Sequence, residues 1–331
     1  MRPLLGFTKE ELVAVCRDAS VRWVEDGTNE DRTYTLRNTV RYLLKTGVLP
    51  MALRTGRLLK LAENVAEREM RVETLAQGHF ERMDVRLDVR LGRAAFIVRD
   101  DRLVREAGFH VRAVILRKLM ALVAPQDVPS LRDLRQTVET VFASCPLSGT
   151  VPRFNVAGIS MRAERDTRDN IVYTIQRSTP TSHEHEKRRL EMPLLPRDAS
   201  DKASDWHLWD GRYWLRVWSL DTSHTSKRVV VVRFMKPDDL AAARQSLLET
   251  ERKRLNRHLA SAPNGLPFTL PAIFELGDHM TAGERLVALP SLGWSRDTGE
   301  RRDGESCFWE VRYKKVEFEC STLHTMEGYG S

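Results

Sequence analysis

The sequence has few cysteines and no long apolar run. Its four cysteines lie far apart and form no C-x-x-C pair, so we interpret them as thiols in a reducing compartment. No apolar run approaches the roughly 20 residues that span a bilayer, and no apolar signal segment follows the first residues. Acidic residues occur early, at Glu10 and Glu11, which disfavours a transit peptide. We therefore expect neither a disulfide scaffold nor a membrane partner.

Familiar catalytic motifs are also missing. The chain contains neither a glycine-rich phosphate loop nor a G-x-S-x-G elbow. Residues 183–186 read His-Glu-His-Glu and offer metal-ligating side chains. A structural zinc site takes four ligands, however, and no partner cluster lies nearby in the sequence. The sequence thus predicts no metal site, and we assign no catalytic residue.

What the chain does contain is an excess of positive charge. Lys and Arg number 53 against 46 Asp and Glu, a net charge of +7. Arginine suits phosphate through its planar fork of donors, so the excess indicates an anionic partner. The densest basic cluster would place four side chains on a helix in a way that suits phosphate: Arg252, Lys253, Arg254 and Arg257. A solvated charged surface is the alternative interpretation.

The first fifty residues predict two helices. Thr8 and Glu11 have the spacing of a capping box, and apolar residues follow at helical spacing. After a loop, a second helix carries Arg37 and Arg41 one turn apart beside an apolar side. Two such arginines form a fork that can hold a carboxylate or a phosphate. A solvated basic surface is again the alternative.

The remainder predicts an α+β fold. A helix of about 30 residues after Pro50 precedes a strand at 85–91 and helices at 111–123 and 131–142. Strand patterns then dominate, at 154–161, 171–176, 213–218, 229–234, 268–274, 285–289 and 308–316, with one helix opened by Pro237. Residues 145–152 are interpreted as a linker. The tryptophans and tyrosine at 213, 214, 218 and 294 are interpreted as core residues and not as a base-stacking platform.

Three short motifs at the start of the chain occur in a recognisable order. They are Arg2-Pro3-Leu4-Leu5, the segment from Trp23 to Asp31 (W-V-E-D-G-T-N-E-D), and Arg37-Asn38-Thr39-Val40-Arg41. This series resembles the tRNA(Ile)-lysidine synthases of the PP-loop ATPase (N-type ATP pyrophosphatase) superfamily. Residues 208–214 (L-W-D-G-R-Y-W) resemble a further motif of that family, and residues 289–294 resemble one of its strand ends.

The resemblance implies a domain organisation. Residues 1–49 would be the C-terminal remnant of the PP-loop catalytic domain, the end of an α/β nucleotide-binding domain. Residues 50–145 would form a helical tRNA-binding or linker domain, and 150–331 a β-rich α+β domain with an exposed insertion at 178–205. The family's Ser-Gly-Gly-x-Asp-Ser loop has no counterpart in these 331 residues. We therefore expect ATP with Mg²⁺ to bind the complete enzyme and neither to bind this chain alone.

The family reaction attaches lysine to the wobble cytidine of the CAU anticodon of tRNA(Ile), using ATP. The resemblance thus implies tRNA(Ile), lysine and ATP as partners. By carry-over, Arg37 would contact an anion, with Asn38 and Arg41 in support. Arg212 would join the basic cluster at 252–257 in contacting tRNA. Local capping and core packing are the alternatives for Trp23, Asp26 and Asn29.

Two other functions stay open at this point. In the first alternative, the chain is a non-catalytic RNA-binding module. In the second, it is the complementary half of a split enzyme that assembles in trans. A homodimer is also left open. The expected compartment is the mitochondrion if the source is eukaryotic and the cytoplasm otherwise.

Overall fold

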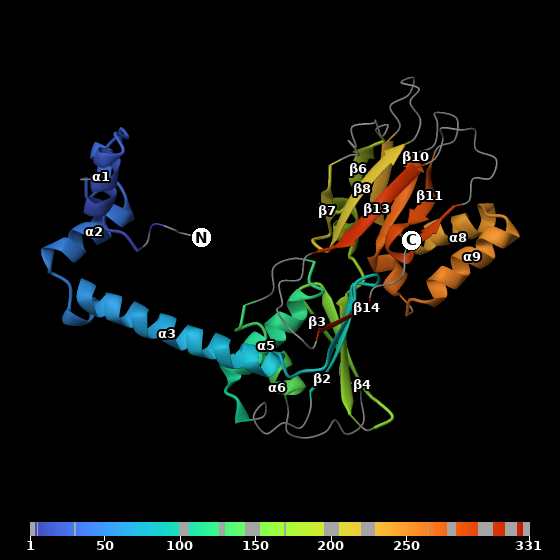
Figure 1. Ribbon diagram of the computed structural model, residues 1–331, viewed down its shortest axis with the longest axis horizontal. Helices are drawn as coiled ribbons and strands as arrows, with labels where there is room; N and C mark the ends of the chain where they lie inside the picture. Colours follow the sequence, from blue (N-terminus) through green and yellow to red (C-terminus); the bar gives the residue numbers. More distant parts are fainter. Residues whose placement is uncertain are drawn as a thin grey trace. The chain divides into compact units, whose positions relative to one another are not determined.

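The computed structural model forms two compact units, Met1–Met70 and Arg71–Ser331, which are described separately (Figure 1). The structure describes residues 4, 6–29, 31–98, 106–125, 130–142, 153–168, 170–194, 205–219, 229–263, 265–276, 283–296, 307–314 and 323–326. Its mixture of helices and mainly antiparallel sheets confirms the predicted α+β class.

The first unit is helical. Its elements are α1 (Lys9–Asp18), the 3₁₀ turn η1 (Gly27–Asn29), α2 (Leu36–Thr46), the 3₁₀ turn η2 (Met51–Leu53) and the beginning of α3 (Thr55–Phe80). The capping box predicted at Thr8 and Glu11 is present at the start of α1. Helix α2 is capped by the Thr35 side chain and ends at Gly47, whose φ of 67° suits glycine.

The first unit buries very little of its own apolar surface. Asn38 is the one buried side chain among its described residues. Leu36 is 82% exposed and Val40 46% exposed, although both lie on the apolar side of α2. Trp23, for which core packing was expected, is 42% exposed. That expectation is wrong within this unit, where the Arg17 guanidinium of α1 lies 6.0 Å from the ring centre and leaves much of the ring exposed.

The second unit begins with helices on a six-stranded sheet. Its helices are the end of α3, α5 (Phe109–Ala121) and α6 (Arg135–Val141). The sheet has the order β14-β1-β2-β5-β4-β3, and only the β14–β1 pair is parallel. Its strands are β1 (Val85–Asp88), β2 (Arg93–Ile97), β3 (Arg153–Val156), β4 (Ile159–Arg165), β5 (Ile171–Arg177) and β14 (Leu323–Met326). Phe80, Phe96 and Leu116 belong to the core between helices and sheet.

The rest of the second unit contains two antiparallel sheets around another core. The five-stranded sheet has the order β12-β11-β10-β9-β6, and the three-stranded sheet β13-β8-β7. Their strands are β6 (Leu190–Pro193), β7 (His207–Trp209), β8 (Tyr213–Ser219), β9 (Val229–Phe234), β10 (Pro271–Leu276), β11 (Glu284–Leu289), β12 (Trp294–Ser295) and β13 (Cys307–Tyr313). Helices α7 (Ser182–Lys187), α8 (Pro237–Ser246) and α9 (Glu249–Ala260) and the 3₁₀ turns η3 (Leu266–Thr269) and η4 (Pro290–Leu292) complete this part.

Two predicted boundaries differ from the structure. Strand β2 pairs with β5 along its whole length, so one sheet crosses the boundary predicted at residues 145–150. The insertion predicted at 178–205 is ordered in its first part, where α7 leads into β6, and β6 pairs with β9. Met192 of β6 is fully buried. Residues 178–194 are therefore not an exposed insertion, while 195–204 and the linker predicted at 145–152 lie outside the described residues.

Two further expectations concern membrane spans and cysteines. Within the described parts of the chain, no helix combines the length and the hydropathy needed to cross a membrane. Cys16 and Cys307 are free thiols of intermediate exposure. The other two cysteines of the sequence lie outside the described residues.

Candidate functional site

The loop between α1 and α2 is held by a single buried amide. The Nδ2 group of Asn38 donates to the carbonyl oxygens of Thr28 and Asp31, both at 2.9 Å. Asn38 is 6% exposed, so these hydrogen bonds are shielded from water. Its position in the first turn of α2, after the Thr35 cap, aims the side chain back at the loop. The residue predicted to support Arg37 therefore connects the loop to the helix.

The two arginines of α2 have different surroundings. Arg41 donates from Nη1 to Oδ1 of Asn29 at 3.2 Å, and Asn29 donates from Nδ2 to the Asp26 carbonyl at 3.0 Å. Arg37 is exposed and has no ion pair or side-chain hydrogen bond to any described residue. Asn38 and Arg41 thus fix the loop, while the Arg37 guanidinium keeps its donors available. Its predicted contact with an anion stays a prediction.

The carboxylates of this loop accept hydrogen bonds from residues of the same turns. Asp26 accepts from the backbone and hydroxyl of Thr28 at 2.9 and 2.7 Å, and these bonds lower its pKa. Asp31 accepts in the same way from Thr33 at 2.8 and 2.6 Å. No cluster of three metal-ligating side chains is present in the described parts of the chain. The carboxylates of Asp26 and Asp31 are therefore used in shaping the loop.

The predicted basic cluster lies on α9 and divides between two sides of that helix. Arg252, Lys253 and Arg257 are exposed, and Lys253 forms an i,i+4 ion pair with Glu249 at 2.9 Å. Arg254 points the other way and donates to the Ser295 carbonyl at 3.1 Å. Leu255 and Leu259 on that side are buried. Three of the four predicted cations consequently face solvent, and Arg254 helps attach the helix to β12.

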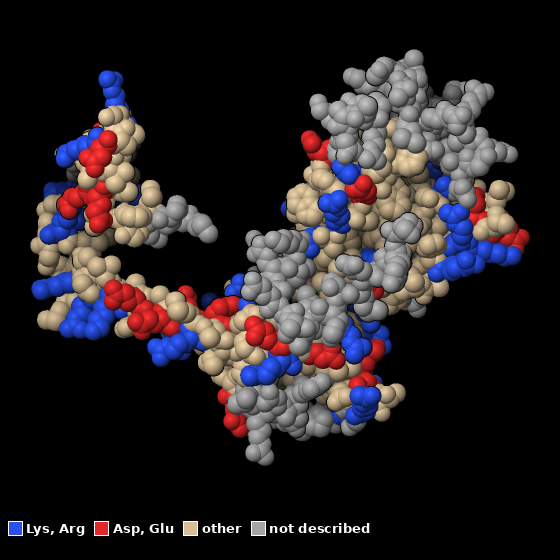
Figure 2. Space-filling model, viewed as in Figure 1, with Lys and Arg blue, Asp and Glu red and all other residues tan. Residues whose placement is uncertain are grey.

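Arg244 of α8 adds a cation that the sequence pattern did not identify. Its Nε and Nη2 donate to Oδ1 of Asn256 on α9 at 3.1 and 2.9 Å. Because Asn256 lies between the exposed cations of α9, this contact brings Arg244 beside them. Figure 2 shows basic side chains, with some acidic ones, over α8 and α9. We call Arg244, Arg252, Lys253 and Arg257 the α8–α9 basic surface.

Arg212, also predicted to contact tRNA, lies inside the protein. Its side chain is fully buried between two sheets, and it donates to Oδ2 of Asp210 at 2.9 Å and to the Thr269 carbonyl at 2.5 Å. Burial lowers the pKa of Arg212, but the charge of Asp210, the neighbouring Tyr213 and Tyr313 and the hydrogen bond to Asp210 together outweigh burial, and the net shift is upward. A buried guanidinium presents no donor to a phosphate, so this structure gives Arg212 a role in the fold.

Asp210 is the centre of a buried ionic cluster. Its Oδ2 also accepts from Nε of the fully buried Arg177 at 3.3 Å, and Arg188 lies 3.5 Å from its Oδ1. Arg177 in turn donates to Glu184 of α7 at 2.5 Å. The cluster joins β5, α7 and the turn between β7 and β8. These contacts give the Asp-Gly-Arg motif at this turn a structural role.

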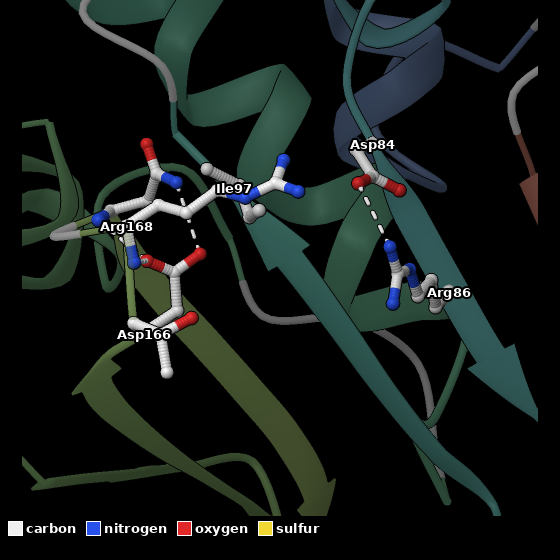
Figure 3. A pocket seen from close by; sticks show the side chains of 7 residues that line it. Asp84, Arg86, Ile97, Asp166 and Arg168 are labelled. Carbon is white, nitrogen blue, oxygen red and sulfur yellow. Dashed lines mark hydrogen bonds and ion pairs between the residues drawn. The ribbon is translucent and has the colours of Figure 1, made fainter.

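A pocket of about 390 Å³ lies at one end of the six-stranded sheet. It is lined by Asp84, Arg86, Ile97, Asp166, Thr167, Arg168 and Asn170. Figure 3 shows Asp166 and Arg168 on one side and Asp84 and Arg86 on the other. Asp166 accepts hydrogen bonds from the backbone N–H groups of Arg168 and Asn170, and Arg86 forms an ion pair with Asp84 at 3.4 Å. Paired charges of both signs give this pocket no preference for an anion, and it holds none of the predicted site residues.

The histidines at 183 and 185 belong to the short helix α7, which has a capping box formed by Thr181 and Glu184. His185 packs edge-on against Phe234, with ring centroids 5.6 Å apart. Its pKa is lowered, first by burial and then by Lys236 and Arg233. Glu184 is engaged by Arg177, so this segment stabilises the fold.

Comparison with known protein families gives a match at the start of the chain. Residues 1–46 match the family described as the PP-loop domain, over the part of the chain that contains α1, the Asn38-bound loop and α2. This match supports the PP-loop ATPase superfamily, whose members are ATP pyrophosphatase-type enzymes. At the level of that family it indicates ATP-dependent chemistry and ATP binding with Mg²⁺. No curated protein and no solved structure matches the chain.

Proposed function

We propose that this protein functions in tRNA modification as a tRNA(Ile)-lysidine synthase, which attaches lysine to the wobble cytidine of the CAU anticodon using ATP. The proposal rests on one observation above the others. The segment that matches the PP-loop domain is also the segment in which Asn38 and Arg41 hold a loop in place and leave Arg37 free. An exposed guanidinium beside a fixed loop is suited to an anionic group of a substrate.

The α8–α9 basic surface gives this proposal a place for the tRNA backbone. Arg244, Arg252 and Arg257 have no ion pair to a described carboxylate, so their charges are not cancelled locally. Contacts between such cations and phosphates release counterions, which makes affinity fall with salt. In this proposal the second unit supplies general affinity for tRNA, and Arg37 acts on the reacting groups.

The test measures binding and reaction on the same preparation. The purified full chain is titrated with tRNA(Ile) bearing a CAU anticodon and with an unrelated tRNA, each at two salt concentrations. Incorporation of radiolabelled lysine into tRNA is then measured with ATP and Mg²⁺ present. Arg37→Ala is compared with Arg22→Ala, which removes another exposed cation of the first unit.

The expected result is preference for tRNA(Ile) by this chain and, once the nucleotide-binding portion of the enzyme is supplied, lysine incorporation that Arg37→Ala lowers by at least about tenfold at an unchanged melting temperature. Equal binding of both tRNAs without incorporation would support an RNA-binding module instead. No binding of either tRNA would reject a role with tRNA. If Arg37→Ala and Arg22→Ala behave alike, Arg37 has no special role.

The exposure of the first unit favours a second candidate, in which the chain works with a separate nucleotide-binding chain. Residues 1–46 of this unit match the PP-loop domain, yet Asn38 is the one buried residue of the unit within the described range. Leu36, Val40 and Trp23 stay exposed on it. Lysine incorporation that appears only after such a chain is added would establish this arrangement.

A further inference from the structure

The three-stranded sheet has one buried side and one exposed side. Along β7 and β8, the side chains of Trp209, Tyr213 and Leu215 point into the core and are at most 2% exposed. The alternate residues point outward, where Leu208 is 47% and Trp214 38% exposed. Side chains alternate along a strand, so one side of this sheet is formed by outward residues alone.

The outward residues are arranged in rows across the three strands. Leu208 pairs with Trp214, and Trp214 pairs with Arg312, whose side chain is 69% exposed. The rings and cations near this row are also in contact, because the Arg312 guanidinium lies 4.5 Å from the centre of the Trp206 ring. Figure 2 shows uncharged surface together with charged side chains over β7 and β8.

Further rows continue the same mixture of rings and cations. Arg216 lies over the Trp206 ring at 4.9 Å and makes a bidentate ion pair with Glu310 at 3.0 and 2.9 Å. Beyond it, Trp218 and Phe308 stack at 6.2 Å with an interplanar angle of 17°. Trp218 is only 7% exposed, so the accessible planar groups of the outward side are those of Trp206, Trp214 and Arg312. We call it the β7–β8–β13 outer face.

Trp214 is the residue that local packing does not explain. Cross-strand ion pairing accounts for Arg216 and Glu310, and ring stacking accounts for Trp218 and Phe308. Within the described residues, Trp214 makes neither a ring contact nor a side-chain hydrogen bond. An exposed tryptophan between a leucine and an arginine has an open ring surface. Such a surface is costly in water unless a partner covers it.

The chemistry of the outer face suits nucleic-acid bases as a partner better than it suits a purely apolar protein surface. Unpaired bases stack on indole rings and on guanidinium planes, and sheets that carry aromatic side chains bind two or three bases in this way. Here indole and guanidinium groups adjoin each other on a chain of net charge +7. We propose that the β7–β8–β13 outer face binds unpaired RNA nucleotides, stacking bases on Trp214 and on the Trp206–Arg312 pair.

This inference rests on the proposed function, since it takes RNA as the partner. It deepens that function by assigning unpaired nucleotides to a surface that shares no residue with the α8–α9 basic surface. The two surfaces also differ in chemistry. Phosphate contacts dominate on α9, whereas stacking on Trp214 depends little on salt.

The experiment uses the full chain and a labelled, unpaired oligoadenylate, followed by fluorescence anisotropy. Trp214→Ala removes the ring, and Trp214→Phe keeps an aromatic group. Leu276→Ala, an exposed apolar residue at the end of β10, is the matched control. We expect Trp214→Ala to weaken binding about tenfold, Trp214→Phe to recover most of it, and the control to match the parent chain. Melting temperatures of all variants should agree.

Each contrary result has a distinct meaning. If the parent chain binds tRNA and Trp214→Ala leaves oligoadenylate binding unchanged, the inference fails and the proposed function stands. If the parent chain binds neither RNA, both fail. If Trp214→Ala changes only self-association in analytical ultracentrifugation, the outer face is an interface between copies of this chain, and the RNA assignment is overturned.

Discussion

At the scale of single residues, the candidate site depends on which side-chain amides and guanidiniums already have hydrogen-bond partners in the loop. Asn38 directs its amide to two carbonyls, Arg41 directs part of its guanidinium to Asn29, and Arg37 has no described partner. The sequence motif places all three side by side without distinguishing them. The structure separates two residues that hold the loop from one that is available for a ligand.

Asn38→Ala should loosen this loop. The change removes hydrogen bonds to the carbonyls of Thr28 and Asp31, and we expect a loss of about 1–2 kcal/mol in the stability of the first unit. Hydrogen exchange of residues 26–36 measures the effect, with Arg37→Ala as a control that should leave protection unchanged. Unaltered exchange in Asn38→Ala would show that the loop is held by other contacts.

Lys314 should make stability depend on alkaline pH. Its Nζ donates to the Ala124 carbonyl at 2.8 Å, and burial, followed by the charge of Arg212, lowers its pKa from 10.5 to about 8. Between these values the unfolded chain binds the proton and the folded chain does not, so stability rises with pH in this window.

The measurement is urea unfolding at pH 8 and pH 10. We expect the stability of the parent chain relative to Lys314→Met to increase by on the order of 1 kcal/mol across this range. The comparison removes the titration of other groups, including Tyr313, whose pKa is raised by burial. A difference that is constant or falls with pH would contradict the assigned shift.

At the scale of elements, helix α9 uses some of its basic side chains to attach to the protein and leaves the others exposed to solvent. Arg254 and His258 bond to the carbonyls of Ser295 and Leu292, at 3.1 and 2.8 Å. Arg252, Lys253 and Arg257 occupy the other side. The buried Leu255 and Leu259 fix this orientation, so apolar packing decides which cations reach solvent.

Neutralising Arg252, Lys253 and Arg257 with glutamine should weaken tRNA binding and flatten its salt dependence. Removing one cation–phosphate contact lowers the slope of log affinity against log salt by about 1. The matched control neutralises Arg135, Arg162 and Arg285, which are paired with carboxylates elsewhere in the second unit. Equal slopes for the two triple variants would remove α9 from the interface.

Much of the element order was predictable, and the failures have local causes. The capping box at Thr8, the helix after Pro50 and the strand at 229–234 follow from patterns that act over few residues. The strand predicted at 154–161 is instead a hairpin, because Ala157 and Gly158 both adopt positive φ. The helix predicted from Pro237 is divided at Leu247, which is extended at the end of α8.

The sequence left the surroundings of several side chains open because burial depends on non-local contacts. Alternation along β8 shows that Tyr213 and Trp214 face opposite sides, but it does not show which side is covered. The structure buries Tyr213 and exposes Trp214, so the core assignment of Trp214 is wrong. Arg212 illustrates the converse, since its charge suggested a surface residue and Asp210 makes its burial tolerable.

At the scale of the whole molecule, two compact units carry different parts of the proposed function. Residues 1–46 of the first match the PP-loop domain, and the second contains three sheets, two of which are joined by the cluster around Asp210. That cluster connects β5 of the six-stranded sheet to the turn before β8 of the three-stranded sheet. The charged side chains of Arg177, Asp210 and Arg212 are fully buried, and they form a junction between the two cores.

Asp210→Asn should break this junction. The change leaves the buried guanidiniums of Arg177 and Arg212 without their carboxylate, and removing one partner of a buried ion pair costs about 3–5 kcal/mol. Urea unfolding of the full chain measures the loss, with Leu208→Ala as an exposed neighbour that should cost little. A loss below about 1 kcal/mol would mean that water or other groups replace the carboxylate.

The neighbouring Gly211 leads to an evolutionary consequence. Its φ is +64°, and a Cβ atom there would lie 2.4 Å from the Pro125 carbonyl oxygen, a distance that no side chain tolerates. A residue with a side chain therefore cannot replace Gly211 unless the backbone after α5 moves as well. Related chains that keep this fold should therefore retain Asp210, Gly211 and Arg212 whether or not they retain Arg37. The tetrapeptide that begins at Trp209 is thus expected to mark the fold and not the proposed reaction.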